Sequence, residues 1–163
     1  MRQFRHGPAI GAVQALNAGP GVLEIELTES VLMAATDGHR DAVQRLRALG
    51  VRIAIDDFGT GFSSLQYLHA YSVDRIKIAQ EFVRGAAAQC GDGAIINATI
   101  GLAQALKIET IAEGVETLEQ LMFLAKAGCR TIQGYYFSRP LPADAVVPLL
   151  REGRFHSPLA LAS

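Results

Sequence analysis

The chain has 163 residues, of which half are hydrophobic and 19% are charged, and its formal net charge is −1. This balance fits one ordinary globular domain and, because the basic residues are dispersed, argues against a surface for nucleic-acid polymers or anionic membranes. No apolar run approaches the roughly 18 residues of a membrane span and no signal-peptide core follows Met1, so we expect a cytoplasmic chain in which Cys90 and Cys129 are free, buried thiols.

Short β-branched runs alternate with longer helical patterns along the chain, which is typical of a parallel sheet built from β/α units. The expected strands span residues 22–27, 51–55, 74–78, 110–112 and 131–133. The expected helices span residues 38–49, 63–69, 93–106, 118–127 and 143–152. The regular alternation predicts the α/β class and leaves no linker that would divide the chain.

Local signals mark several of the predicted helix ends. Thr117 and Gln120 have the spacing of a capping box, and Gly128 follows the same helix at the position where a left-handed residue is favoured. Asp92 is a candidate N-cap for the long apolar helix that follows it. Pro148 lies inside the last predicted helix and is expected to shorten it.

Two adjacent acids, Asp56 and Asp57, follow the second predicted strand directly and precede a loop that contains Gly59, Thr60 and Gly61. Neighbouring carboxylates repel each other unless a cation lies beside them, and hard divalent cations favour oxygen ligands. The glycines allow a tight turn and a close approach to a ligand. We interpret the segment as a metal site at the mouth of the sheet. The simpler alternative is a helix-capping turn after a strand.

The five predicted strands each have a polar residue at the C-terminal end, namely Glu26, Asp56, Lys77, Glu113 and Gln133. In a (β/α)₈ barrel the catalytic groups come from these strand ends, which favours a shared site. Taken alone, each has a simpler interpretation: a surface lysine, an acid near a helix N-terminus, or an amide that satisfies backbone groups. A barrel has typically ~250 residues, so we expect about five of eight units here and the first strands upstream.

Five segments are similar, in order and spacing, to the EAL domain, a family of cyclic di-GMP phosphodiesterases with a modified TIM-barrel fold. They are LEIELTES (23–30), DDFGTGFSSL (56–65), RIKI (75–78), IAEGVET (111–117) and QGYYFSRP (133–140). The resemblance implies a TIM-barrel-like (β/α) EAL fold, C-terminal portion only. Residues 1–155 would form a partial EAL domain and residues 156–163 a C-terminal tail. The glutamate of the Glu-Ala-Leu signature and a metal-binding asparagine would lie upstream.

The resemblance also implies roles for individual residues. The expected metal ligands, for Mg²⁺ or Mn²⁺ in a two-metal site, are Glu26, Asp56, Asp57 and Glu113. The expected catalytic residues are Lys77, which would contact the attacking water, together with Glu113 and Asp56. Expected to support the loop or line the substrate site are Glu29, Gly59, Thr60, Gly61, Glu116 and Gln133. The implied reaction opens one phosphodiester of cyclic di-GMP and gives linear pGpG.

The chain departs from the family pattern at three positions. Ala79 and Gln80 follow the strand that carries Lys77 where the family has Asp and commonly Arg, and Arg130 replaces an Asp. Because the signature glutamate and asparagine are not in the sequence, an alternative is a catalytically inactive module that binds cyclic di-GMP or regulates a partner. A five-stranded arc also has open edges, so we expect a homodimer or contact with other domains of a larger signalling protein.

Overall fold

A computed structural model describes residues 6–16, 18–33, 37–61, 68, 70–86 and 91–152. Five parallel strands form one sheet in the order β1-β2-β3-β4-β5. The strands are β1 (Glu24–Thr28), β2 (Arg52–Phe58), β3 (Arg75–Ile78), β4 (Glu109–Ala112) and β5 (Thr131–Ile132). The helices are α1 (His6–Leu16), α2 (Glu29–Met33), α3 (Asp37–Ala48), α5 (Gln80–Gly85), α6 (Asp92–Leu106), α7 (Leu118–Ala127) and α8 (Ala143–Glu152).

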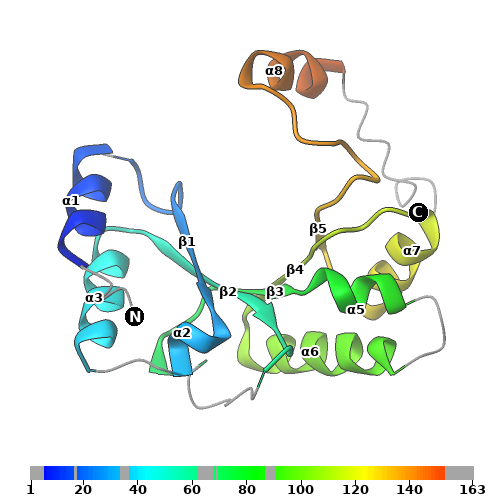
Figure 1. Cartoon of the computed structure of the whole chain (residues 1–163), viewed down its shortest axis with the longest axis horizontal. Coiled ribbons are helices and arrows are strands. Elements are labelled where there is room, and N and C mark those ends of the chain that lie inside the picture. The colour runs from blue at the N-terminus through cyan, green and yellow to red at the C-terminus, as the bar shows by residue number, and fades with distance from the viewer. Residues whose placement is uncertain are drawn as a thin grey trace.

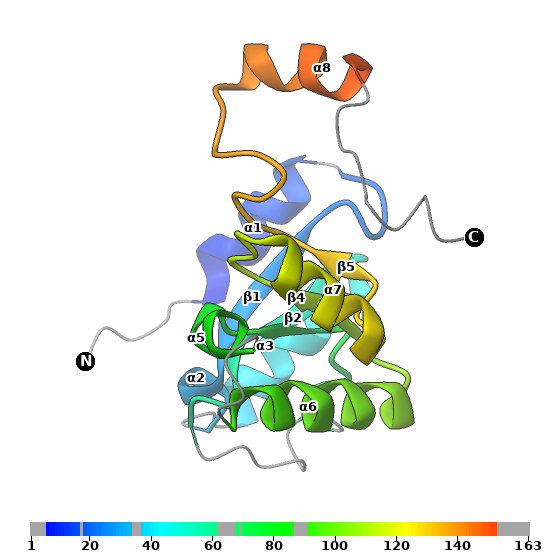
Figure 2. The ribbon, with the colours of Figure 1, turned by 90° about the vertical axis from the view of Figure 1, so that its right-hand side faces the viewer.

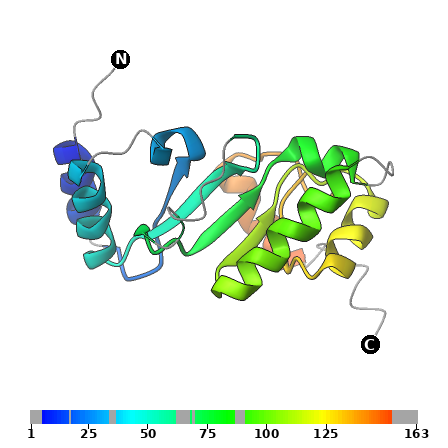
Figure 3. The same ribbon diagram turned by 90° about the horizontal axis from the view of Figure 1, so that it is seen from below.

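The helices are arranged around the sheet as in part of a barrel. Figure 1 shows α3, α6 and α7 around the outside of the strands, at the left, below and at the right, and Figure 3 shows α1 and α3 at one end with α5, α6 and α7 at the other. Figure 2 shows that α8 stands away from the sheet. The predicted α/β fold, the C-terminal portion of a TIM-barrel-like domain, is confirmed.

The strands bury one face under the helices. Ile53, Ile55, Ile76 and Ile78 have exposed fractions of 2% or less, and they pack into two clusters with apolar side chains of α5, α6 and α7 and of the segments between the strands. Because side chains alternate along a strand, the residues between these isoleucines point to the opposite face. The buried isoleucines therefore decide which polar residues share the other face.

All five predicted strands are confirmed, with ends that differ by at most three residues. The predicted helix at 118–127 is confirmed together with its capping box and the left-handed Gly128. Asp92 was wrong as an N-cap, because the helix begins at Asp92 itself and the cap position is Gly91. Pro148 does not shorten α8, which reaches Glu152 as predicted. The predicted helix at 63–69 lies outside the described residues except for position 68, as do Cys90 and the tail.

Three helices were not predicted from the sequence. α1 contains glycines and a proline that weaken the helical pattern, and α2 has only five residues. α5 has six residues, of which Phe82 and Val83 are buried against α6. A single turn of helix gains little from intrinsic propensity, so it depends on packing that a local pattern does not reveal.

Candidate functional site

Lys77 lies among three carboxylates at the edge of the sheet where the strands end. Its Nζ atom is 2.7 Å from Oε2 of Glu26, 2.9 Å from Oδ1 of Asp56 and 3.0 Å from Oε1 of Glu113. The Lys77 side chain is only 8% exposed. Four of the five strand-end residues identified in the sequence therefore meet in one cluster, because parallel strands bring these ends together.

The three carboxylates keep the Lys77 ammonium charged. Burial by itself would lower the pKa of Lys77, but its close contacts with Glu26, Asp56 and Glu113 outweigh burial and raise the pKa well above the ordinary value. The Oδ1 atom of Asp56 is buried and makes no hydrogen bond of good geometry within the described residues, although it lies at ion-pair distance from Nζ. The short distance to Nζ shows that the ammonium is the partner of this oxygen.

The side chains of Asp56 and Asp57 do not follow the regular alternation between the two faces of a strand. The register between β2 and β3 shifts between Ile55 and Phe58, and Asp57 has a positive φ of 52°. Phe58 consequently packs in the same core cluster as Ile53 and Ile55, while the Asp57 side chain is exposed. A bulge of this kind re-aims side chains at the end of a strand. It lets the chain place two successive acids at the mouth without burying the second among isoleucines.

The loop after β2 is held against the start of α2. The backbone N–H of Gly59 donates to Oε2 of buried Glu29 at 3.4 Å, and the hydroxyl of Thr60 donates to the carbonyl of Asp57 at 2.9 Å. A Cβ at Gly61 would lie 3.4 Å from the Glu29 carboxylate. The predicted bracing residue is thus beside the loop, and its role remains a prediction.

The loops after β4 and β5 are in direct backbone contact. Val115 N–H donates to the carbonyl of Gln133 at 3.1 Å, and Tyr136 N–H donates to the carbonyl of Val115 at 2.9 Å. A Cβ at Gly134 would lie 2.1 Å from the Val115 carbonyl oxygen, so only glycine allows this approach. The pairing positions Glu113 on one loop beside Gln133 on the other.

A pocket of about 310 Å³ opens between these two loops. Among its lining residues are Glu113, Glu116 and Gln133 of the predicted site, together with Gln80 and Tyr135. Glu116 accepts a hydrogen bond from the side chain of Gln80 at 3.4 Å. The pocket therefore borders the carboxylate cluster and offers polar groups to a neighbouring ligand.

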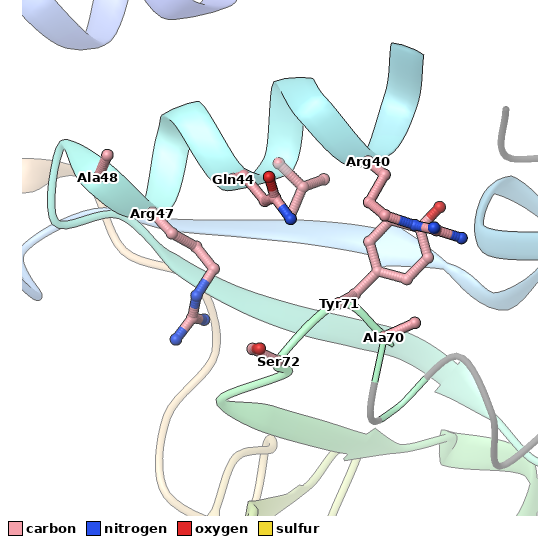
Figure 4. Close-up of a pocket in the computed structure, with 8 residues that line it drawn as sticks. Arg40, Gln44, Arg47, Ala48, Ala70, Tyr71 and Ser72 are labelled. Atoms are coloured by element: carbon pink, nitrogen blue, oxygen red, sulfur yellow. The ribbon is translucent and has the colours of Figure 1, made fainter. Parts of the chain in front are cut away.

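A second pocket, of about 410 Å³, lies on the helix-covered side against α3. Figure 4 shows Arg40, Gln44 and Arg47 of α3 facing Tyr71 and Ser72. Arg47 is already paired with Asp74 of the segment before β3. None of the predicted site residues lines this pocket, so it is separate from the cluster around Lys77.

Sequence reasoning missed a second charged cluster on the same face as Lys77. Arg75 contacts Glu24 at 3.1 Å and Glu109 at 2.8 Å, and Arg52 contacts Glu109 at 2.7 Å and Glu24 at 3.8 Å. We call these four residues the lower charge cluster. Its members lie on four strands and precede those of the Lys77 cluster by two or four residues, so the period-2 spacing of charges was the signal that could have found it.

The donor set around Lys77 has the chemistry that a hard divalent ion requires, namely several carboxylates close together. Within the described ranges, however, no three acidic, histidine or cysteine side chains are placed to hold a metal ion as they stand. The carboxylates are instead arranged around an ammonium. Glu26, Asp56 and Glu113 are the residues that would hold a metal at this edge.

Known proteins match this chain over most of its length. The family model for the EAL domain matches residues 3–140. The cyclic di-GMP phosphodiesterase NbdA of Pseudomonas aeruginosa is 45% identical over 141 residues, which cover 86% of this chain and 18% of NbdA. The chain spans less than a quarter of the length of the first curated relatives that it matches.

Solved structures agree with this match. The PaMucR phosphodiesterase in complex with c-di-GMP is 39% identical with a TM-score of 0.78, over 83% of this chain and 55% of that one. A manganese and cyclic di-GMP complex of BlrP1 from Klebsiella pneumoniae is 36% identical with a TM-score of 0.73, over 82% of this chain and 34% of that one. In the part that the structure describes, no helix is long and apolar enough to cross a membrane. The sequence match, the shared fold and the cluster of strand-end residues agree, and the chain belongs to the EAL domain family.

Proposed function

We propose that the chain carries the C-terminal part of a metal-dependent cyclic di-GMP phosphodiesterase site. The observation that carries the proposal is the meeting of Glu26, Asp56 and Glu113, from the units of β1, β2 and β4, within 3.0 Å of the Lys77 ammonium on β3. Membership of the EAL family and the cyclic di-GMP bound by PaMucR and BlrP1 support the substrate class. The product would be linear pGpG.

Hydrolysis would break one P–O ester bond of the ring, join the water oxygen to phosphorus and return a proton to the released ribose oxygen. When bound, a divalent ion, proposed as Mg²⁺ or Mn²⁺, supplies positive charge that activates water and neutralises phosphoryl oxygens. Glu26, Asp56 and Glu113 would hold the ion, and exposed Asp57 would serve a second one. Lys77 would donate a hydrogen bond to the attacking water or to a phosphate oxygen, because its raised pKa keeps it protonated.

The surrounding residues would fix this geometry. Glu29 would hold the glycine loop through the N–H of Gly59, and Gln133 would line the substrate side next to Glu113. Glu116 would support the loop after β4, which also carries Glu113, through its hydrogen bond with Gln80. Small displacements of such supporting groups cost activity because the reacting atoms must stay aligned.

The test is incubation of the pure chain with cyclic di-GMP and Mn²⁺ or Mg²⁺, followed by mass-resolved chromatography for pGpG. A chelator sample and an Asp56→Asn variant should lose the product, whereas Asp41→Asn, an exposed control on α3, should keep it. Equal turnover by Asp56→Asn would show that the cluster does not perform the reaction.

A non-catalytic module is the second candidate. It is favoured by one observation, that among the residues described here no ready-made group of metal ligands exists and that Lys77 occupies the centre of the carboxylates. Calorimetric binding of cyclic di-GMP without any pGpG, at all metal concentrations, would select this candidate.

We further propose that residues 1–155 act as a partial EAL domain with a short tail, in the cytoplasm, and that copies associate. β1 and β5 are the terminal strands of the sheet, so each has one edge without a neighbouring strand in the described part. A homodimer mass in size-exclusion chromatography with light scattering is expected. A monomer at every concentration would remove this part of the proposal.

A further inference from the structure

The Lys77 ammonium has as many N–H donors as it has neighbouring carboxylates. An ammonium has three N–H donors, and three carboxylates, those of Glu26, Asp56 and Glu113, lie between 2.7 and 3.0 Å from Nζ. Each carboxylate comes from a different strand or strand end, so no two of them are neighbours in the sequence. A single buried cation on β3 therefore connects four β/α units at the mouth of the sheet.

The cluster nevertheless has a charge imbalance. Three carboxylates and one ammonium leave two negative charges, whereas the lower charge cluster, with two arginines and two glutamates, is balanced. An excess of like charge at such a site is unfavourable unless a cation is close. The Lys77 cluster therefore favours the approach of further positive charge, which a divalent ion would supply.

The ammonium and a divalent ion cannot share one centre. Oxygen ligands lie at roughly 2.0–2.1 Å from Mg²⁺, considerably closer than the 2.7–3.0 Å seen here around nitrogen. For the carboxylates to close on a metal, Nζ must first withdraw from between them. Asp56 Oδ1, which lies 2.9 Å from Nζ, is one of the three oxygens that this withdrawal would free for the ion.

We propose that Lys77 is an internal counter-ion, which holds the three carboxylates together in the metal-free protein and must leave their centre when a divalent ion binds. The inference rests on the metal-binding part of the proposed function. It assigns Lys77 a positioning role in the metal-free state in addition to the contact with water expected in the reaction. Metal binding and the displacement of one side chain would then be a single coupled event.

If the two events are coupled, Lys77→Met should lower the stability of the metal-free protein and raise its affinity for Mn²⁺. Lys77→Met keeps the apolar stem but removes the charge, so the metal-free protein should lose stability because the carboxylates repel each other. Mn²⁺ should bind at least tenfold more tightly, because it no longer competes with an ammonium. Lys126→Met, an exposed position near the end of α7, is the matched control and should change neither quantity.

The experiment measures Mn²⁺ affinity by calorimetry and thermal unfolding by circular dichroism, at one neutral pH, for the parent and both variants. Tighter Mn²⁺ binding by Lys77→Met, with a melting temperature that is lowered without metal and restored by it, is the expected result. Unchanged or weaker binding by a folded Lys77→Met overturns the inference and leaves the proposed metal requirement intact. If neither protein binds Mn²⁺, the metal requirement itself is wrong and the inference fails with it.

A second measurement does not depend on whether the variant folds. The protonated side-chain amine of a buried, paired lysine gives a proton–nitrogen NMR signal that can be followed in the parent protein. Addition of Mg²⁺ should shift or remove the Lys77 signal at the same concentration at which the metal binds. A Lys77 signal that stays unchanged in the metal-loaded protein overturns the proposed displacement.

Discussion

Gly134→Ala tests whether the contact between the loops after β4 and β5 depends on the absence of a side chain. A Cβ at this position would lie 2.1 Å from the carbonyl oxygen of Val115 and 2.3 Å from its nitrogen, against a practical minimum of 3.0 Å. Both neighbouring atoms belong to backbone, so no side chain can rotate away. The two loops must therefore separate by roughly 0.9 Å at this point.

The magnitude follows from what the separation breaks. Two backbone hydrogen bonds cross the contact, from Val115 to Gln133 at 3.1 Å and from Tyr136 to Val115 at 2.9 Å. Overpacking costs about 1–3 kcal/mol, and each weakened hydrogen bond costs about 1 kcal/mol more. We expect Gly134→Ala to lower the free energy of unfolding by about 3–5 kcal/mol, and to disturb Glu113 on the same loop.

Gly101→Ala is the matched control, because the same atom is added in open space. Gly101 lies inside α6 and a Cβ there meets nothing within 4 Å. Replacing a glycine inside a helix by alanine stabilises by about 0.5–1 kcal/mol. Urea unfolding followed by circular dichroism should therefore place the two variants on opposite sides of the parent. If Gly134→Ala unfolds within about 0.5 kcal/mol of the parent, the steric argument for this loop contact is wrong.

Three further predictions concern stability and reactivity. Thr117→Ala should cost about 1 kcal/mol in urea unfolding, because Thr117 Oγ1 caps the N–H of Gln120 in a complete capping box, and Thr117→Ser should recover most of it. Arg75 and Arg52 lower the pKa of Glu109, so Glu109 contributes stability above its unfolded pKa that is lost as the pH falls through the folded value. Stability of Glu109→Gln should accordingly fall less than that of the parent between about pH 5 and pH 3, and parallel curves would contradict the ion pairs. Burial raises the pKa of the Cys129 thiol, so a thiol reagent should label Cys129 at neutral pH only at the rate of unfolding, and rapid labelling of native protein would contradict its burial.

The sequence predicted those parts of the fold that depend on local pattern. The strands alternate with helices, and the capping box at Thr117 and Gln120 predicts the start of its helix to within one residue. The convergence of Glu26, Asp56, Lys77 and Glu113 was also predictable, because strand ends in consecutive parallel units lie at one edge.

The remaining features depend on contacts between segments far apart in the chain. The bulge at Asp57 becomes visible only when β2 is paired with β3, and the ion pairs of Arg75 require the register of four strands at once, from β1 to β4. The helix α5 was missed because six residues carry too short a pattern, and buried Phe82 is what fixes it. Long-range register, rather than residue type, is the information that a single sequence lacks here.

The lower charge cluster has a consequence for how the sheet forms. Glu24 pairs with Arg52 and Arg75 pairs with Glu109 in the observed register. A slip of one residue would turn these charges toward the helices and the isoleucines toward water, and a slip of two would place Arg75 opposite Ile111. Strands aligned in either of these ways would lose the ion pairs of the lower charge cluster. The four charges therefore favour the observed register over its alternatives.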